Sequence, residues 1–211
     1  LMILTSNQSG YWKNNVTLFS HALRVTSNNV LAHNNLGDAL FEDGKTKEAI
    51  DHYSEAIRIK PKYFSYYNNR ASSYARLGQY QLAIDDYNKS IQLKPDCMRC
   101  LYNRGCTYLE SGQYHLAIED FNKAIRLVPD YVSAHYNKGI ACAKLGRNDQ
   151  AIENFSKAIG FNPNYALAYY SRGLAYILQG NYKNACLDAR KLCELGNCQM
   201  LEFAKSHGHC F

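Results

Sequence analysis

Residues 98–131 read MRCLYNRGCTYLESGQYHLAIEDFNKAIRLVPDY, and this stretch decides the fold. Apolar or small residues recur in its first half at helical spacing until Gly112, which is placed to end a helix in a turn. A second apolar stripe ends before Pro129, because proline cannot donate the next hydrogen bond and constrains the preceding residue. Gly105 and Ala117 are small, so two helices could approach closely there. The stretch therefore predicts a hairpin of two antiparallel helices.

The same features recur along the chain with a period of 34 residues. The periodic residues are Pro61, Pro95, Pro129 and Pro163; Gly10, Gly44, Gly78, Gly112, Gly146 and Gly180; and Ala49, Ala83, Ala117, Ala151 and Ala185. A fixed period of this length is typical of a repeat protein. One hairpin cannot bury its apolar face alone, so neighbouring hairpins are expected to stack. We therefore predict an all-α solenoid that forms one continuous domain.

The periodic residues also resemble a known family. Residues 30–63 carry Leu36-Gly37, Ala49, Tyr53, Ala56 and Pro61. These follow the pattern Trp/Tyr-x2-Leu-Gly-x2-Tyr, then Ala, an aromatic, Ala and Pro, so the chain resembles the tetratricopeptide repeat (TPR) family. It is similar to the TPR regions of bacterial TPR proteins, some of which are fused to multi-pass membrane segments. The resemblance implies a right-handed superhelical solenoid of antiparallel helix hairpins and a scaffold that binds other proteins.

The repeat register divides the chain into seven expected segments. They are an N-terminal half repeat at 1–29 that contains only the second helix, full repeats at 30–63, 64–97, 98–131 and 132–165, a degenerate repeat at 166–197, and a C-terminal capping helix and tail at 198–211. In the degenerate repeat, Ala189, Leu192 and Asn197 replace the usual aromatic, alanine and proline. A terminal repeat should depart in this way, because its outer face meets water or a capping helix.

The first residues leave the relation to a membrane open. Leu1-Met2-Ile3-Leu4 could be a capping segment or the cut end of a transmembrane helix. Residues 11–26 resemble the segment that joins membrane spans to repeats in some bacterial membrane proteins. Crossing a bilayer takes about 20 apolar residues, and we find no such run in the sequence. We therefore expect the chain to associate with a membrane only if a missing upstream segment anchors it. Its localisation stays open between the cytoplasm and, if it is tethered upstream, the extracytoplasmic side of a bacterial membrane.

A further periodic series falls on the first helix of each hairpin, which is expected to line the concave groove. An asparagine recurs at Asn35, Asn69, Asn103 and Asn137, and beside this series lie Asn34, Asn68, Tyr102, Tyr136 and Tyr170. An Asn amide offers the donors and the acceptor that match a peptide group, and tyrosine adds contact area at low entropy cost. Together with Arg76, these residues form the predicted peptide-binding groove. Alternatively, the asparagines bond neighbouring backbone or bridge adjacent repeats.

The predicted groove is polar in its first half and apolar in its second. We therefore expect apolar or aromatic anchors of a ligand to dock on the later repeats, unless the C-terminal cap covers that stretch. Two other functions stay open. One is an accessory domain that presents substrates to a membrane-bound glycosyltransferase-like protein. The other is a self-assembling homo-oligomer that forms through the truncated N-terminal end.

Charge and motifs argue against several other functions. The net charge is +6, with basic and acidic residues interspersed and no nucleic-acid motif, so we expect no nucleic-acid partner. The sequence has no phosphate-binding glycine loop, no HExxH and no nucleophile–base pair on a plausible turn. We therefore predict that the chain is not an enzyme, that it binds no cofactor, and that it has no catalytic or metal-binding residues.

Eight cysteines are present. Cys97 and Cys100 form a CxxC, which we interpret as incidental, because no thioredoxin-like strand pattern surrounds it. Cys186 and Cys210 are equidistant from a turn at about residue 198, so a disulfide between them would hold the cap in an oxidising compartment. The less favoured alternative is a zinc site, whose spacing fits no zinc motif. Its ligands would be Cys198, His207, His209 and Cys210.

Overall fold

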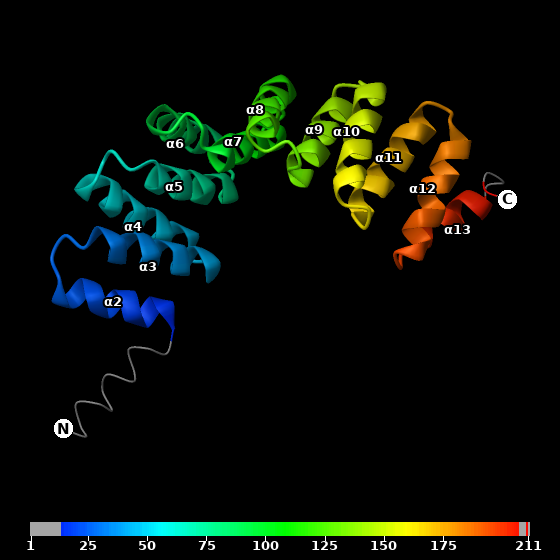
Figure 1. Cartoon of the computed structure of the whole chain (residues 1–211). Helices are drawn as coiled ribbons and strands as arrows, with labels where there is room; N and C mark the ends of the chain where they lie inside the picture. The colour runs from blue at the N-terminus through cyan, green and yellow to red at the C-terminus, as the bar shows by residue number, and fades with distance from the viewer. Residues whose placement is uncertain (1–13, 207–209, 211) are drawn as a thin grey trace. The chain divides into compact units, whose positions relative to one another are not determined.

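The computed structural model describes residues 14–206 and 210, and within them it contains twelve helices and no strand (Figure 1). The helices are α2 (Asn15–Val25), α3 (Val30–Glu42), α4 (Thr46–Ile59), α5 (Phe64–Arg76), α6 (Tyr80–Leu93), α7 (Met98–Glu110), α8 (Tyr114–Leu127), α9 (Val132–Lys144), α10 (Asn148–Phe161), α11 (Ala166–Leu178), α12 (Tyr182–Glu194) and α13 (Gln199–Ser206). The predicted all-α solenoid class is confirmed.

The chain reverses direction within each hairpin at a glycine of the 34-residue series. Gly44, between α3 and α4, has a φ of +78°, and the backbone N–H of Lys45 donates to the carbonyl of Leu40 at 2.8 Å. A side chain would be strained at this φ, which explains why glycine occupies the position. The glycines are therefore set by the turn that each hairpin needs.

The two helices of a hairpin approach closely where a glycine faces an aromatic ring. A Cβ added to Gly37 on α3 would lie 2.6 Å from Cε1 of Tyr53 on α4. The same construction at Gly139 on α9 gives 2.6 Å to Cε1 of Phe155 on α10. Both rings are buried. The core of a repeat is thus a ring packed on bare helix backbone, with alanines around it.

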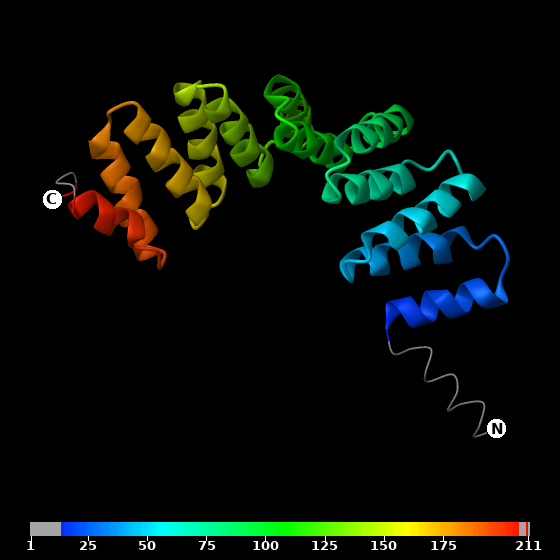
Figure 2. The same ribbon diagram turned by 180° about the vertical axis from the view of Figure 1, so that it is seen from behind.

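The chain divides into two compact units, Leu1–Thr107 and Tyr108–Phe211. We call them unit 1 and unit 2. In unit 1, helices that follow one another from α2 to α6 pack in sequence. In unit 2 the same holds from α8 to α12, and α13 packs on α12 (Figure 2).

Among the described residues, no helix is long and apolar enough to cross a membrane. The apolar tetrad Leu1-Met2-Ile3-Leu4, which carries one of the alternatives above, lies outside the described residues.

Candidate functional site

The asparagines of unit 1 form hydrogen bonds between successive repeats. Asn69 on α5 donates its side-chain amide to Asn34 Oδ1 at 3.2 Å and to Asp38 Oδ1 at 3.0 Å, both on α3. Asn103 on α7 donates to Asn68 Oδ1 on α5 at 3.3 Å. Each bond joins the first helices of adjacent hairpins. We call this network the asparagine ladder; it consists of Asn34, Asn35, Asp38, Asn68, Asn69 and Asn103.

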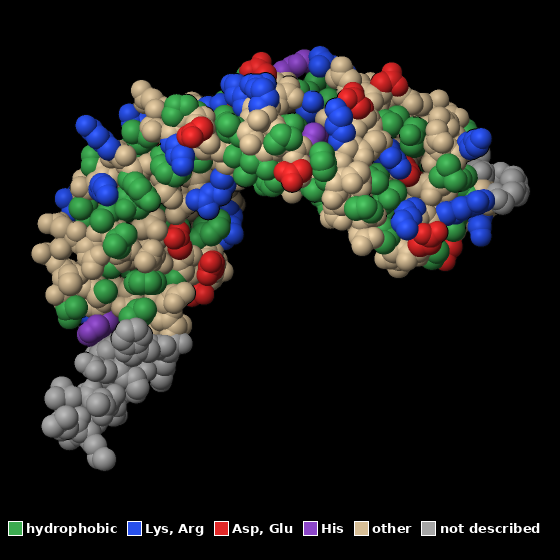
Figure 3. Space-filling view, viewed as in Figure 1, with side chains coloured by type: hydrophobic (Ala, Val, Ile, Leu, Met, Phe, Trp, Pro, Cys, Tyr) green, Lys and Arg blue, Asp and Glu red, His purple; other side chains and the backbone are tan. Residues whose placement is uncertain are grey.

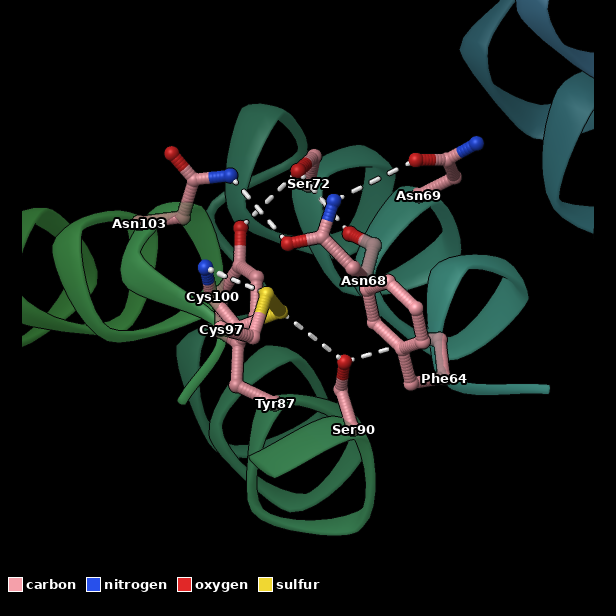
Figure 4. The surroundings of a disulfide bond; sticks show 9 residues. All are labelled: Phe64, Asn68, Asn69, Ser72, Tyr87, Ser90, Cys97, Cys100 and Asn103. Atoms are coloured by element: carbon pink, nitrogen blue, oxygen red, sulfur yellow. Dashed lines mark hydrogen bonds between the residues drawn. A yellow bond between two sulfur atoms is a disulfide. The ribbon is translucent and has the colours of Figure 1, made fainter. Parts of the chain in front are cut away.

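Further bonds of the ladder lie within a single helix. Asn34 donates to Asn35 Oδ1 at 3.3 Å and to Asp38 Oδ2 at 3.0 Å. One repeat later, Asn68 donates to Asn69 Oδ1 at 3.2 Å, as Figure 4 shows. Both amide hydrogens of Asn34 are therefore used inside the protein. The bridging role that we weighed for the asparagines is the arrangement found in unit 1.

Two tyrosines of the second helices contact Asp38 of the ladder and the equivalent residue of the next repeat. The hydroxyl of Tyr53 on α4 donates to Asp38 Oδ1 at 2.7 Å. Burial first, and then the hydrogen bond to Asp38, raise the pKa of Tyr53 far above its usual value, so the hydroxyl stays protonated. In the next hairpin, Tyr87 OH and Ser72 Oγ lie 2.9 Å apart (Figure 4). Tyr53 thus fixes Asp38 of the ladder to the buried core of its hairpin, and Tyr87 makes the equivalent contact with Ser72, which is not a member of the ladder.

The members of the ladder differ in what they can still offer to a ligand. Asn68 is 2% exposed, so its amide serves its two neighbours. Asn35 and Asn103 are half-buried, on α3 and α7. Among the described residues, Asn35 Nδ2 and Asn103 Oδ1 take part in no hydrogen bond. These two groups keep a free donor and a free acceptor on the first-helix face.

Arg76, at the end of α5, is held against α3. Its guanidinium carbon lies 3.4 Å from the centroid of the Phe41 ring, and its Nη1 donates to the Phe41 carbonyl at 2.5 Å. The residue is exposed. Stacking and hydrogen bond together give this cation one position beside the ladder.

In unit 2 the same register continues with different chemistry. Tyr136 OH on α9 lies 3.3 Å from Ser171 Oγ on α11, the same step between repeats as from Asn34 to Asn69. The Tyr136 ring also meets the Tyr165 ring edge-on, with centroids 5.1 Å apart. The other predicted groove residues are placed as follows: Tyr102 and Asn137 are half-buried on α7 and α9, and Tyr170 is exposed on α11.

The first-helix face is polar in unit 1 and apolar in unit 2, and the change affects both members of a hydrogen-bonded pair of residues. Tyr53 and Tyr87 of unit 1 correspond to Phe155 in unit 2, which has no hydroxyl. At the position of their partners Asp38 and Ser72, unit 2 carries Ile140. The donor and its acceptor are thus lost together, so neither of this pair is left buried without the other. This paired change was readable in the sequence, and our sequence reasoning missed it.

An apolar pocket of about 590 Å³ lies at the C-terminal end of unit 2. We call it the C-terminal pocket. Its wall on α11 is made by Tyr170, Leu174 and Ile177, which are 45%, 41% and 38% exposed. The remaining wall comes from α12, α13 and Cys210. The cap therefore covers part of the apolar stretch and leaves the rest open.

A second periodic network was also missed. Arg70 makes two hydrogen bonds to the carboxylate of Asp86, at 2.7 and 2.8 Å, and a third to Ser54 Oγ at 3.0 Å. Arg172 does the same with Asp188 and Ser156. Each arginine ties a first helix to its own second helix and to the preceding one. The signal was present as a 34-residue series of Arg70, Arg104 and Arg172 with Asp86, Asp120 and Asp188, interrupted at Lys138 and Asn154.

Three disulfides are formed by the described residues. The hypothesised Cys186–Cys210 bond is confirmed, and a further bond joins Cys193 to Cys198. The CxxC that we interpreted as incidental is also bonded, as Cys97–Cys100 at the start of α7 (Figure 4).

The zinc alternative has little left to support it. Cys198 and Cys210 are both in disulfides, and His207 and His209 lie outside the described residues. Within the described part of the chain, no three His, Cys, Asp or Glu residues are grouped to hold a metal.

Charged side chains are dispersed over the visible face of each unit. In the space-filling view, side chains of Lys and Arg and of Asp and Glu are scattered among polar and apolar ones (Figure 3). Several of the cations are already paired with carboxylates, among them Arg70 with Asp86 and Arg172 with Asp188. The visible faces therefore show no single large patch of one charge (Figure 3).

Comparisons with known proteins bear on the repeat fold. Profiles of three repeat families match the chain: the TPR repeat at residues 37–78, and the tetratricopeptide repeat at 63–130 and at 102–166 and 144–197. Comparison with curated proteins found no match.

Several solved structures resemble the chain. The crystal structure of MamA is 26% identical, with a TM-score of 0.72, and the match covers 81% of this chain and 97% of that one. MamA from Desulfovibrio magneticus RS-1 is 23% identical, with a TM-score of 0.76, and covers 81% and 96%. YrrB, a TPR protein with an unusual peptide-binding site, is 20% identical, with a TM-score of 0.72, and covers 89% and 97%.

Proposed function

Because the chain belongs to the tetratricopeptide repeat family, we propose that it binds an extended segment of a partner protein along the faces of its first helices. The repeat fold and the TPR relatives support a protein–protein interaction scaffold. The finer assignment, to these faces and to an extended segment, rests on the side chains described above.

One observation carries the proposal. The first-helix face of α11 exposes Tyr170, Leu174 and Ile177, each by more than a third of its surface, beside an apolar pocket. A contiguous exposed apolar patch lowers solubility, so its presence on a folded protein indicates a binding site. Tyrosine is enriched where proteins recognise one another. The partner segment is therefore expected to place apolar or aromatic side chains on α11.

The asparagine ladder has a supporting part in this proposal. Its internal bonds hold the first helices of unit 1 in register, which keeps the binding face rigid before a ligand arrives. The groups left over are the amide of Asn35 and the carbonyl oxygen of Asn103. They can pair with the backbone of a bound segment regardless of its side chains. The expected ligand is thus held through its backbone in unit 1 and through side chains in unit 2.

The test compares capture of proteins from an extract of the source cell by immobilised variants. The double variant Tyr170→Ala/Leu174→Ala removes the apolar face of α11. Leu187→Ala is the matched control, because Leu187 is 55% exposed on α12 and does not line the pocket. We expect proteins held by wild type and by Leu187→Ala to be lost at least tenfold with the double variant. Equal capture by all three proteins would refute the proposal.

The two other functions are separated by simple measurements. Self-assembly predicts a mass above that of the monomer in gel filtration with light scattering, whereas binding of a different protein does not require it. An accessory role beside a membrane enzyme predicts that the captured partner carries membrane spans. Neither outcome changes which face of unit 2 is expected to bind.

A further inference from the structure

The last helix of unit 2, α13, is placed unlike the other helices. It has 8 residues, whereas α3, α5, α9 and α11 each have 13. None of its residues is buried, and Phe203 is 65% exposed. Helices of this length are marginal in water on their own. The position of α13 must therefore depend on ties to the rest of unit 2.

The first tie is a single side chain that repairs the degenerate repeat. Met200 Cε of α13 lies 2.6 Å from where a Cβ of Gly173 would be, on α11. In the hairpin of α3 and α4, the corresponding place beside Gly37 is filled by Tyr53 from the second helix. In the last hairpin that second-helix residue is Ala189, which is too small to fill it. Met200 takes over the space, so α13 completes the core of the repeat.

The other ties are covalent. Cys193–Cys198 joins the end of α12 to the residue before α13, and Cys186–Cys210 joins the middle of α12 to the chain beyond α13. The second bond closes a loop with a sequence separation of 24. A disulfide that closes a longer loop restricts the unfolded chain more, and so stabilises the folded chain more. Cys186–Cys210 is thus expected to be the stronger of the two ties.

The C-terminal pocket exists only while α13 stays in place. Gln199, Met200, Phe203 and Ala204 of α13 form one side of the pocket, and both sulfurs of the long-loop disulfide belong to residues that line it. If α13 moved away, Tyr170 and Leu174 would remain as a flat, open face. The disulfide is therefore part of the wall as well as the tie that keeps the wall closed.

The lining indicates what the pocket would accept. No Asp, Glu, Lys or Arg lines it, and its volume of about 590 Å³ lies within the usual range for ligand sites. Its lining is continuous with the first-helix face of α11, because Tyr170 and Leu174 belong to both. A segment lying along that face would reach the pocket with its side chains. An aromatic or branched aliphatic side chain meets these conditions.

We propose that the C-terminal pocket seats an apolar side chain of the bound partner segment, and that the Cys186–Cys210 disulfide controls whether the pocket is available. This inference rests on the proposed function and adds its anchor and its regulation. A dithiol reductant would donate two electrons and two protons to the disulfide. The products are the thiols of Cys186 and Cys210 and the oxidised, cyclic disulfide of the reductant. Release of α13 would then remove one side of the pocket.

The test uses the full oxidised chain and N-phenyl-1-naphthylamine, an uncharged fluorescent probe of apolar sites. We expect one saturable site in the oxidised wild type. Dithiothreitol, or the variant Cys186→Ser/Cys210→Ser, should raise the Kd of the probe at least tenfold. The matched control is Cys97→Ser/Cys100→Ser, which removes a disulfide of unit 1. Its Kd for the probe should equal that of wild type in the oxidised state and should rise on reduction.

A second variant tests the pocket without touching a cysteine. Ala204 lines the pocket from α13, so Ala204→Trp should fill it and abolish probe binding. Hydrogen exchange of residues 199–206 reports whether α13 is still docked. Protection should persist in Ala204→Trp, and it should fall at least tenfold in reduced wild type. Unchanged probe affinity in Ala204→Trp would overturn the pocket, and unchanged affinity and protection after reduction would overturn the control by the disulfide.

The outcome can be told apart from failure of the proposed function. If Tyr170→Ala/Leu174→Ala loses the partner while Ala204→Trp retains it, the first-helix face binds and the pocket does not. If both retain it, the proposed function fails as well.

Discussion

Gly139 and Gly160 lie on the two helices of one hairpin, α9 and α10, in opposite surroundings. An added Cβ would lie 2.6 Å from the Phe155 ring at Gly139, whereas it would meet nothing within 4 Å at Gly160. Gly139→Ala should therefore destabilise the protein by about 1–3 kcal/mol through overpacking. Gly160→Ala should stabilise it by about 0.5–1 kcal/mol, because alanine has a higher helix propensity than glycine. Urea denaturation of the two variants measures both signs, and a loss of stability at both sites would contradict this account of the core.

His33 and His52 form the contact at residue scale that should respond to pH. Their Nδ1 atoms are 3.1 Å apart, between α3 and α4. Burial first lowers the pKa of both rings below the usual 6.5, and His33 lowers that of His52 further. The unfolded chain therefore binds more protons than the folded chain between the folded pKa values and 6.5. Stability should thus be full above this window and should fall as the pH drops through it.

The variant His33→Tyr tests this pH dependence. The repeat carries tyrosine at the equivalent Tyr67 and Tyr169, so the substitution fits the register. Urea denaturation between pH 7.5 and 5 should show a smaller loss of stability in the variant than in wild type. Equal slopes for His33→Tyr and wild type would count against the contact.

At the scale of elements, the half-buried arginines Arg70 and Arg172 decide how firmly successive helices are joined. Arg172 and Asp188 have side chains that are 19% and 4% exposed, and they link α11 to α12. Asp188→Ala leaves the half-buried guanidinium without its carboxylate partner, which should cost about 3 kcal/mol, the lower end of the range for a buried pair. The control Glu153→Ala breaks an exposed pair with Lys157 and should cost less than about 1 kcal/mol. Thermal unfolding ranks the two variants, and comparable losses would show that Arg172 and Asp188 do not hold the helices together.

Elements also show how far the sequence could predict the site. The helices and their glycine turns follow from local spacing, so they were predictable from the period. The asparagine ladder was predicted as a series, but which neighbour each amide would bond depends on the distance between stacked helices. The pairing of Tyr53 with Asp38, and its loss at Phe155 with Ile140, could have been read by comparing repeats in register.

The end of unit 2 was harder to predict for a physical reason. Nothing in the 34-residue pattern indicates that Met200 fills the place opposite Gly173, because α13 lies beyond the last full period. The Cys186–Cys210 bond was a hypothesis from its symmetric spacing about a turn, whereas the CxxC gave no comparable reason to expect a bond. The repeat pattern predicts how one hairpin packs on the next hairpin. It does not predict the packing of α13, because no equivalent helix occurs in the other repeats.

At the scale of the whole molecule, reduction should act unevenly on the chain. Among the described residues, the disulfides of unit 2 tie down α13, while that of unit 1 spans only a sequence separation of 3. Short loops restrict the unfolded chain little. Hydrogen exchange with and without dithiothreitol should therefore show lost protection in residues 199–206 and nearly unchanged protection in α3 to α6. Uniform loss over both regions would contradict this view.

Binding of a partner segment on the first-helix faces is the central claim, and site-specific photocrosslinking tests it most directly. A photoreactive p-benzoyl-phenylalanine would replace Tyr170 on α11 in one protein and Leu187 on α12 in another; both positions are exposed. After irradiation in an extract of the source cell, we predict a partner adduct from position 170 and none from position 187. Adducts only from position 187, or the same adducts at equal yield from both, would contradict the claim.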